Sequence, residues 1–254
     1  MAISEDETDG LSGARLYWAV ATVALAITLC VLDSSIANVA LPAIARDFGA
    51  APAESIWIVN AYQLAIVVTL LPLASLGEIF GYRRIYLGGL ALFTFASFTC
   101  SVSRDLVTLS AARTLQGLGA AGVMSVNGAL VRFIYPHRLL GRGIGINAMV
   151  VSAAAAVGPS VASAILAVAP WPWLFAVNIP VGLAALVIAW RSLPANPLSD
   201  RPFDAVSALL NALTFGLVIT GVDVVSRTRA KLMGALELVA GAIVGTLLVM
   251  REWP

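Results

Sequence analysis

The sequence predicts an all-α integral membrane protein, and its composition and hydropathy support that prediction. Of its 254 residues, 60% are hydrophobic and 11% are charged, and the mean hydropathy is +0.93. Soluble domains carry roughly 25% charged residues. Inside a bilayer, backbone polar groups are satisfied only in helices or closed barrels, and the sequence lacks the alternating pattern of a barrel strand. The membrane-spanning elements are therefore expected to be helices.

Eight apolar segments divide the chain. Each has about the 17–25 residues that cross the hydrocarbon layer, some with extra turns. They are predicted at 16–41, 56–76, 85–102, 106–131, 143–169, 173–190, 203–225 and 232–250. The expected organisation is a disordered acidic cytoplasmic tail (1–15), a six-helix transmembrane bundle (16–190), a proline-rich cytoplasmic linker (191–202) and two additional transmembrane helices (203–250).

The basic residues between these segments predict a cytoplasmic N-terminus. With that orientation, nine basic residues lie in cytoplasmic connections and five lie on the opposite side, as the positive-inside rule favours. The connection 226–231 is an exception, because it places three basic residues on the outer side.

The fourth segment contains an arginine at membrane depth. Arg113 lies eight residues from Asp105, about 12 Å along a helix. A cation at that depth costs at least about 2.5–3.5 kcal/mol on insertion scales and usually has a function. On a helix, Arg113 is the first of several polar or small residues that share one face. Such a stripe suits the wall of a solvated cavity. The stripe comprises Arg113, Gln116, Gly117, Ala120, Met124 and Asn127. The alternative interpretation is an arginine that snorkels to the surface.

Asp33 is the second charge at membrane depth, nine residues before Pro42, or about 13 Å along a helix. Because the first and fourth helices run in opposite directions, Asp33 and Arg113 are expected at similar depth. Desolvation favours the neutral acid, whereas a nearby guanidinium favours the carboxylate. Protonation of Asp33 is therefore expected to respond to opening of the cavity or to a cationic substrate. The alternative is a static ion pair that holds two helices together. Glu237 is a further acid, in the eighth segment, and the sequence assigns it no role.

Two further motifs concern conformation. Gly77, Glu78, Gly81, Arg83 and Arg84 lie between the second and third segments, where a glycine permits a tight turn and the arginines suit the cytoplasmic surface. Alone, this pattern is also typical of an ordinary turn.

The fifth segment contains Gly158-Pro159 in a run of small residues. Proline removes a backbone hydrogen bond, and the glycine before it permits a kink, so this pair is predicted to act as a hinge. Glycine and proline also occur in static membrane helices, which is the alternative.

In this order, the aspartate of the first helix, the loop 77–84, the Arg-x-x-Gln-Gly of the fourth helix and the Gly-Pro of the fifth helix resemble the major facilitator superfamily. The first-helix motif and residues 173–182 resemble its fourteen-helix drug:proton antiporter branch (EmrB/QacA type). The resemblance covers about residues 16–250 and concerns the N-terminal portion of that branch.

The resemblance implies a proton-coupled efflux transporter in a bacterial inner membrane that exports lipophilic, often cationic compounds. The acid of the family's first helix corresponds to Asp33 and its asparagine to Asn38, while the arginine implicated in proton coupling corresponds to Arg113. Gln116 and Gly117 match the residues that follow. The expected partners are the lipid bilayer, protons and the substrate. No cofactor, metal site or nucleic acid is expected, since the chain has one histidine and a formal net charge of +1.

This sequence departs from the family pattern at two places. The loop has Ala74, Glu78, Ile79 and Tyr82 where the family usually has Gly, Asp, Arg and Arg, which thins its charge network. After the Gly-Pro of the fifth helix, Ala162-Ser163 stands in place of the usual Gly-Gly.

The family is built from two six-helix halves that rock around a midplane site, and the fourteen-helix branch inserts two helices between them. The sequence matches the first half and the two inserted helices. It is expected to be a fragment or truncation without the C-terminal half, or a half that needs that partner or a second copy. The alternatives are a non-transporting membrane scaffold and a transporter of another small metabolite. An intramembrane enzyme is disfavoured, because no catalytic pair occurs at membrane depth.

Overall fold

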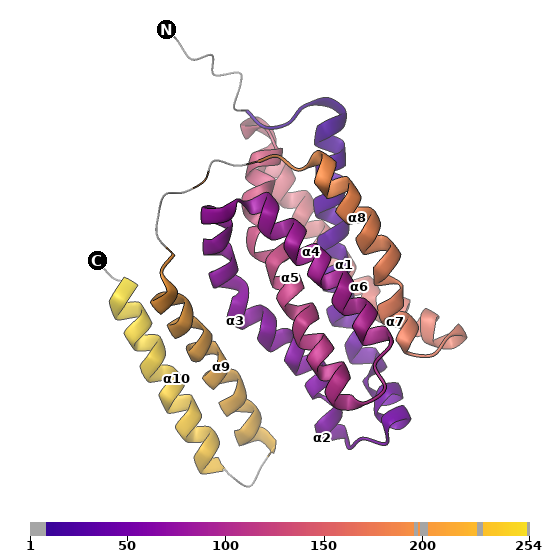
Figure 1. Cartoon of the computed structure of the whole chain (residues 1–254), viewed down its shortest axis with the longest axis vertical. Coiled ribbons are helices and arrows are strands. Elements are labelled where there is room, and N and C mark those ends of the chain that lie inside the picture. The colour runs from indigo at the N-terminus through magenta and orange to yellow at the C-terminus, as the bar shows by residue number, and fades with distance from the viewer. Residues whose placement is uncertain (1–8, 196–197, 199–202, 228–230, 253–254) are drawn as a thin grey trace.

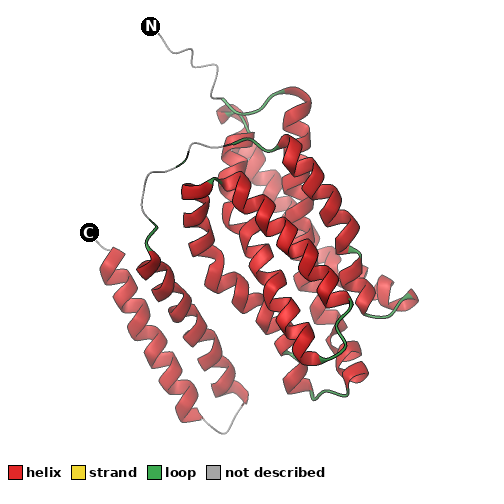
Figure 2. Ribbon diagram, in the orientation of Figure 1, coloured by secondary structure: helices red, strands yellow, loops and turns green. Residues whose placement is uncertain are grey.

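The computed structural model describes residues 9–195, 198, 203–227 and 231–252, and within these ranges the chain forms helices and no strands (Figures 1 and 2). Eight long helices correspond to the eight predicted segments. They are α1 (Gly13–Phe48), α3 (Trp57–Phe80), α4 (Tyr82–Ser101), α5 (Leu106–Ile134), α6 (Leu140–Val168), α8 (Asn178–Ser192), α9 (Ala205–Arg227) and α10 (Lys231–Glu252). Three short elements connect some of them: α2 (Pro52–Ser55), η2 (His137–Leu139) and α7 (Pro172–Ala176).

The helix ends differ from the predicted ones where a helix leaves the apolar stretch. α1 begins at Gly13, inside the expected tail, and continues through Pro42 to Phe48. It ends at Gly49, whose φ of 60° is left-handed and whose N–H caps the last turn. The predicted ends were those of the apolar stretch. A membrane helix can continue beyond that stretch into the membrane–water interface, until a residue such as glycine ends it. Residues 1–8 and half of the expected linker (196–197 and 199–202) lie outside the described residues.

The sixth predicted helix is divided in two. α7 ends at Ala176, Val177 forms a turn, and α8 starts at Asn178. Pro180 has no N–H to donate to the carbonyl group of Ala176, which accounts for the break at this point.

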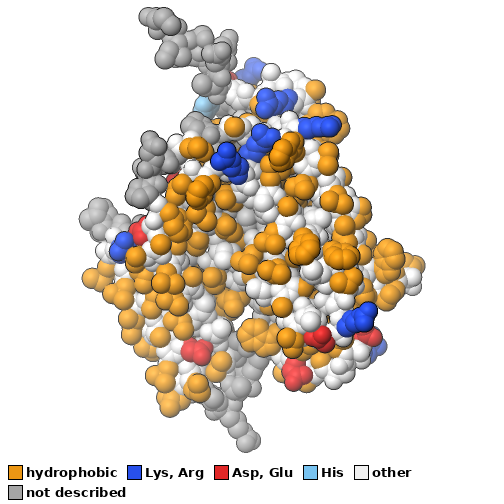
Figure 3. Space-filling view, viewed as in Figure 1, with side chains coloured by type: hydrophobic (Ala, Val, Ile, Leu, Met, Phe, Trp, Pro, Cys, Tyr) orange, Lys and Arg blue, Asp and Glu red, His pale blue; other side chains and the backbone are white. Residues whose placement is uncertain are grey.

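Among the described residues, seven spans are long and apolar enough to cross a membrane. The helix outside that set is α4, which carries Arg83 and Arg84 in its first turn and several hydroxyl residues. It nevertheless packs against α5 and α8 inside the bundle. Hydrophobic side chains cover the sides of the molecule and charged ones gather towards its ends (Figure 3), as expected for a multi-pass membrane protein.

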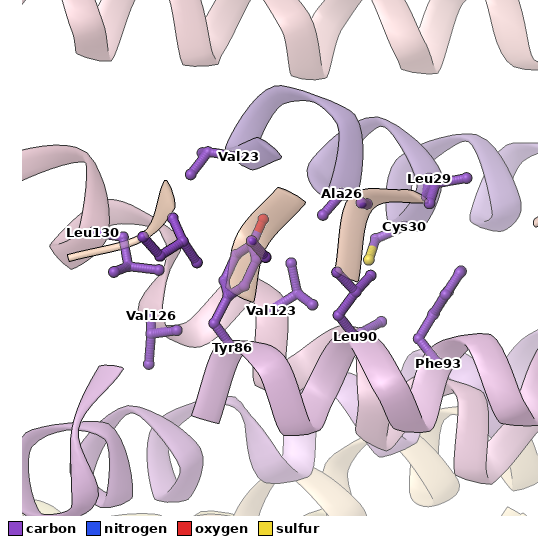
Figure 4. Packing of buried hydrophobic residues seen from close by; sticks show 14 of the residues in the cluster. Val23, Ala26, Leu29, Cys30, Tyr86, Leu90, Phe93, Val123, Val126 and Leu130 are labelled. Carbon is purple, nitrogen blue, oxygen red and sulfur yellow. The ribbon is translucent and has the colours of Figure 1, made fainter. Parts of the chain in front are cut away.

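The main core lies where α1, α4 and α5 meet (Figure 4). Large side chains such as Tyr86 and Phe93 are buried there, and two glycines bring α4 and α5 together. A Cβ atom on Gly119 would lie 2.4 Å from the backbone nitrogen of Phe93, and one on Gly89 would lie 2.7 Å from the carbonyl oxygen of Gly119. Such close backbone approach is typical of membrane helix packing.

α9 and α10 form an antiparallel pair beside α3 (Figure 1). Gly221 and Gly234 face each other, since a Cβ atom on either would lie within 3.0 Å of the other's carbonyl oxygen. Asp204 caps α9 by accepting hydrogen bonds from the N–H groups of Val206 and Ser207. The side of α10 that faces away from α9 is exposed, as a lipid-facing helix requires.

We expect Gly119→Ala to lower the unfolding free energy by about 1–3 kcal/mol, since the new methyl group forces α4 away from α5. Thermal unfolding in detergent measures this effect. Gly128→Ala, in the same helix but with no atom near its Cβ position, is the control and should not lower the melting temperature. Equal melting temperatures for the two variants would contradict the close α4–α5 contact.

Candidate functional site

Asp33 and Arg113 meet in the interior of the bundle, between α1 and α5. Their side chains are 0% exposed, and Arg113 Nη1 donates to Asp33 Oδ2 in an ion pair. The prediction that the two charges lie at the same depth is confirmed. The snorkelling interpretation of Arg113 is wrong, because the guanidinium points into the core.

The other carboxylate oxygen of Asp33 accepts two amide donors from different helices. Gln116 Nε2 lies 2.8 Å from Asp33 Oδ1 and Asn178 Nδ2 lies 2.8 Å from the same atom. Gln116 Oε1 in turn accepts from Arg113 Nη1 at 2.7 Å, and its Nε2 is 2.9 Å from Ser97 Oγ. The carboxylate is therefore solvated by protein donors in place of water, as a buried charge requires.

Aromatic rings from α3 and α7 enclose the guanidinium. The Tyr62 ring centroid lies 4.1 Å from Arg113 Cζ and that of Phe175 lies 5.6 Å away, both within the range of a cation–π contact. Arg113 Nε donates to the carbonyl oxygen of Ile58 at 3.1 Å. Gly117 lets α3 lie close to α5, because a Cβ atom on Gly117 would lie 2.4 Å from the carbonyl oxygen of Tyr62.

These contacts correct the expectation that the α5 stripe lines a solvated cavity. Arg113, Gln116 and Ala120 are 0% exposed, because Tyr62, Phe175 and neighbouring helices cover them. In this conformation the acid and the arginine form a closed, neutral pair. Removing either partner would leave one charge buried and uncompensated.

The structure does not bring the two predicted asparagines to this pair. Asn38 is exposed and donates to the carbonyl oxygen of Ser34, one turn earlier in α1. Asn127 is buried and donates to Asn147 Oδ1 of α6 at 3.1 Å. It lies fourteen residues from Arg113, about 21 Å along α5.

Gly158 and Pro159 lie within an unbroken α6 that packs on α1. A Cβ atom on Gly158 would lie 2.4 Å from Ser35 Cβ, and Ser35 Oγ is 3.3 Å from the carbonyl oxygen of Ala155. Gly158 thus lies where α6 approaches α1 at Ser35, two residues after Asp33, whereas Pro159 is exposed. The hinge role stays a prediction.

The loop motif forms the turn between α3 and α4. Gly81 has a φ of 100°, which favours glycine, and Gly77 is buried against Val126. Arg83 donates to the carbonyl oxygen of Trp190 and lies 5.9 Å from its ring centroid. Glu78 and Arg84 are exposed.

A comparison with known protein families shows to which family the chain belongs. The sequence profile of the Major Facilitator Superfamily matches residues 23–250. The chain belongs to the major facilitator superfamily. Its family and its relatives are those of a transporter and not of an enzyme.

Several relatives within the superfamily are similar to this chain. An uncharacterised transporter of Escherichia coli (strain K12), YebQ, is 49% identical over 97% of this chain and 54% of its own length. The riboflavin transporter RibZ of Clostridioides difficile is 33% identical over 91% of this chain and 50% of its own length. The multidrug export protein EmrB of Haemophilus influenzae is 30% identical over 81% of this chain and 41% of its own length. The chain spans about half the length of these relatives.

Four side chains of the candidate site were not predicted from the sequence, those of Asn178, Ser97, Tyr62 and Phe175. Asn178 is a polar residue inside an apolar segment, and it lies in the stretch 173–182 that carries the resemblance. A buried amide in such a segment needs a hydrogen-bond partner, and this need could have indicated its role. Ser97, Tyr62 and Phe175 gave a weaker signal, because hydroxyl and aromatic residues occur throughout the predicted helices. Their role depends on which helices become neighbours, and that follows from tertiary packing.

We expect Arg113→Met to lower the unfolding free energy by about 3–5 kcal/mol, because Asp33 is left as an unpaired buried charge. Combining it with Asp33→Asn should restore much of that loss, so the two changes are strongly non-additive. Equilibrium unfolding of the two single variants and the double variant measures the coupling.

The exposed pair Asp204–Arg251, with Arg251 Nη2 3.2 Å from Asp204 Oδ2, is the control for this cycle. Asp204→Asn with Arg251→Met should couple by no more than about 1 kcal/mol. Additive effects of the two changes at Asp33 and Arg113 would contradict the buried pair.

Proposed function

We propose that the chain forms the N-terminal part of a proton-coupled efflux transporter in a bacterial inner membrane, in which Asp33 takes up and releases the proton. The observation that supports this most directly is the burial of one acid against one arginine at membrane depth. Intramembrane ionisable residues of this kind are expensive and typical of proton and substrate pathways.

The geometry suggests how one site serves both proton and substrate. Protonation of Asp33 cancels its charge and weakens its contacts with Arg113, Gln116 and Asn178. A cationic substrate near Asp33 would compete with the proton for the same carboxylate. The two ligands then oppose each other through a single group, and this opposition is reciprocal. Arg113 pairs with Asp33 in this conformation, and movement of the helices would separate the two side chains.

In this proposal α1 and α6 move apart to open access to the buried pair. Gly158 lies at their contact and Pro159 follows it in α6, where a hinge would let α6 repack as the transporter halves rock. The other half of that movement would come from a C-terminal half or from a second copy of the chain. We propose these partners together with the substrate.

The distribution of basic residues supports a cytoplasmic N-terminus. Arg15 Nε donates to the carbonyl oxygen of Ser192 and Arg83 donates to that of Trp190, so the start of α1, the end of α8 and the α3–α4 turn lie at one end. Blue side chains gather at this end in Figure 3. Basic residues favour the cytoplasmic side.

Transport of a metabolite is the second candidate function. It is favoured by the similarity to a riboflavin transporter, which is 33% identical over 91% of this chain. Both candidate functions of this chain would use its Asp33–Arg113 pair, and they differ in the substrate.

Transport assays in cells without their own efflux pumps test the proposal. The chain would be expressed alone and joined to the portion of the E. coli relative YebQ that it does not match. We expect efflux of a fluorescent lipophilic cation that an uncoupler stops, and a loss of at least about tenfold with Asp33→Asn or Arg113→Ala. Riboflavin transport in the same cells tests the second candidate.

Glu54→Gln is the matched control for loss of an acid, because Glu54 is exposed and its carboxylate accepts from the N–H of Ala51 and not from Arg113; efflux by this variant should equal that of the parent. Efflux that survives both Asp33→Asn and Arg113→Ala would contradict the mechanism. Absence of transport by either inserted protein would favour the scaffold alternative.

A further inference from the structure

The amide of Asn211 in α9 is buried without a partner. The residue is 3% exposed, and neither Nδ2 nor Oδ1 has a hydrogen bond within the described part of the chain. An asparagine side chain offers two donors and one acceptor oxygen, and leaving such groups unsatisfied costs about 1–3 kcal/mol each. A ligand that supplies an acceptor and a donor would remove this cost.

Asn211 faces a cavity of about 500 Å³ between α3, α9 and α10. This volume is within the range of small-molecule sites. The apolar wall includes Leu71 and Pro72 of α3 and Leu248 of α10. The cavity is separate from the Asp33–Arg113 pair, which none of its lining residues contacts through a hydrogen bond or ion pair in the described structure.

The charged residues among the described lining of this cavity are both acids, Glu78 and Asp204. Hydrogen bonds from Ser207, together with Arg251, lower the pKa of Asp204 to about 2. Asp204 is therefore ionised at neutral pH, and its contact with Arg251 balances its charge. Glu78 also lines the cavity and is exposed, so its carboxylate supplies the negative charge that favours a cation over an anion.

The polar groups lie at two depths. Asn211 follows Asp204 by seven residues, which places it about 10 Å further along α9. A matching ligand carries a cation near the membrane surface, a hydrogen-bonding group several ångströms deeper and an apolar body against α3 and α10.

We propose that this cavity binds an amphipathic ammonium compound from the adjoining leaflet, anchored by Asn211 through a group that both donates and accepts hydrogen bonds. Its source is either an aminophospholipid such as phosphatidylethanolamine or a free lipophilic amine. The proposal is independent of the transport mechanism at Asp33, and either can fail without the other.

Native mass spectrometry of the full chain in detergent tests this proposal. The probe is N-(6-aminohexyl)dodecanamide, which carries an ammonium and an amide, and octadecylamine is the matched compound without the amide. We expect one bound probe per chain, at least about tenfold tighter than octadecylamine, the factor that corresponds to 1.4 kcal/mol. Asn211→Leu should abolish this preference, and Gln63→Leu, which removes an exposed amide from α3, should not.

Two further readouts complete the test. A phosphatidylethanolamine that co-purifies with the chain and is displaced by the probe identifies the lipid source, whereas probe binding to a chain without that lipid identifies a free amine. The melting temperature of the ligand-free Asn211→Leu protein should equal or exceed that of the parent, because an unsatisfied amide is removed. Equal probe binding by Asn211→Leu and the parent, a lower melting temperature of the variant, or no saturable binding at all would each overturn the proposal.

Discussion

The burial of one carboxylate beside one guanidinium is the constraint on which the six-helix bundle depends. Neither charge is stable alone at membrane depth, where each ion loses its hydration. The chain therefore surrounds Asp33 with donors from three further positions: Arg113 and Gln116 of α5 and Asn178 of α8. Because these donors come from helices distant in sequence, their contacts with Asp33 hold α1, α5 and α8 together.

Glycine packing makes this convergence possible. Gly117 admits the backbone of α3 and thereby places Tyr62 over Arg113, while Gly119 and Gly89 bring α4 against α5. In lipid, helices associate through close packing and polar contacts, since the hydrophobic effect gives little drive between them. The same residues that allow close approach thus determine the enclosure of the charged pair.

Much of the architecture could be predicted because membrane constraints act on single segments. Length and hydropathy identified the eight helices, and rise per residue placed Asp33 and Arg113 at equal depth. Asn38 shows the limit of motif transfer: five residues from Asp33, it lies about 140° around the helix and is exposed. Asn127 shares the face of Arg113 but lies at another depth. The contributions of Asn178 and Tyr62 depend on the break at Val177 and on the α3–α5 approach, which no single segment encodes.

The central claim is that Asp33 is the group that exchanges the proton, and infrared difference spectroscopy of its carboxyl group tests it most directly. Spectra of the protein, alone and joined to the remaining portion of its relative, would be compared across pH and with a lipophilic cation. The account predicts a carboxylic acid signal that grows as pH falls, decreases when the cation binds, and is absent in Asp33→Asn. A signal that Asp33→Asn retains, or that the cation leaves unchanged while it binds, would contradict the account.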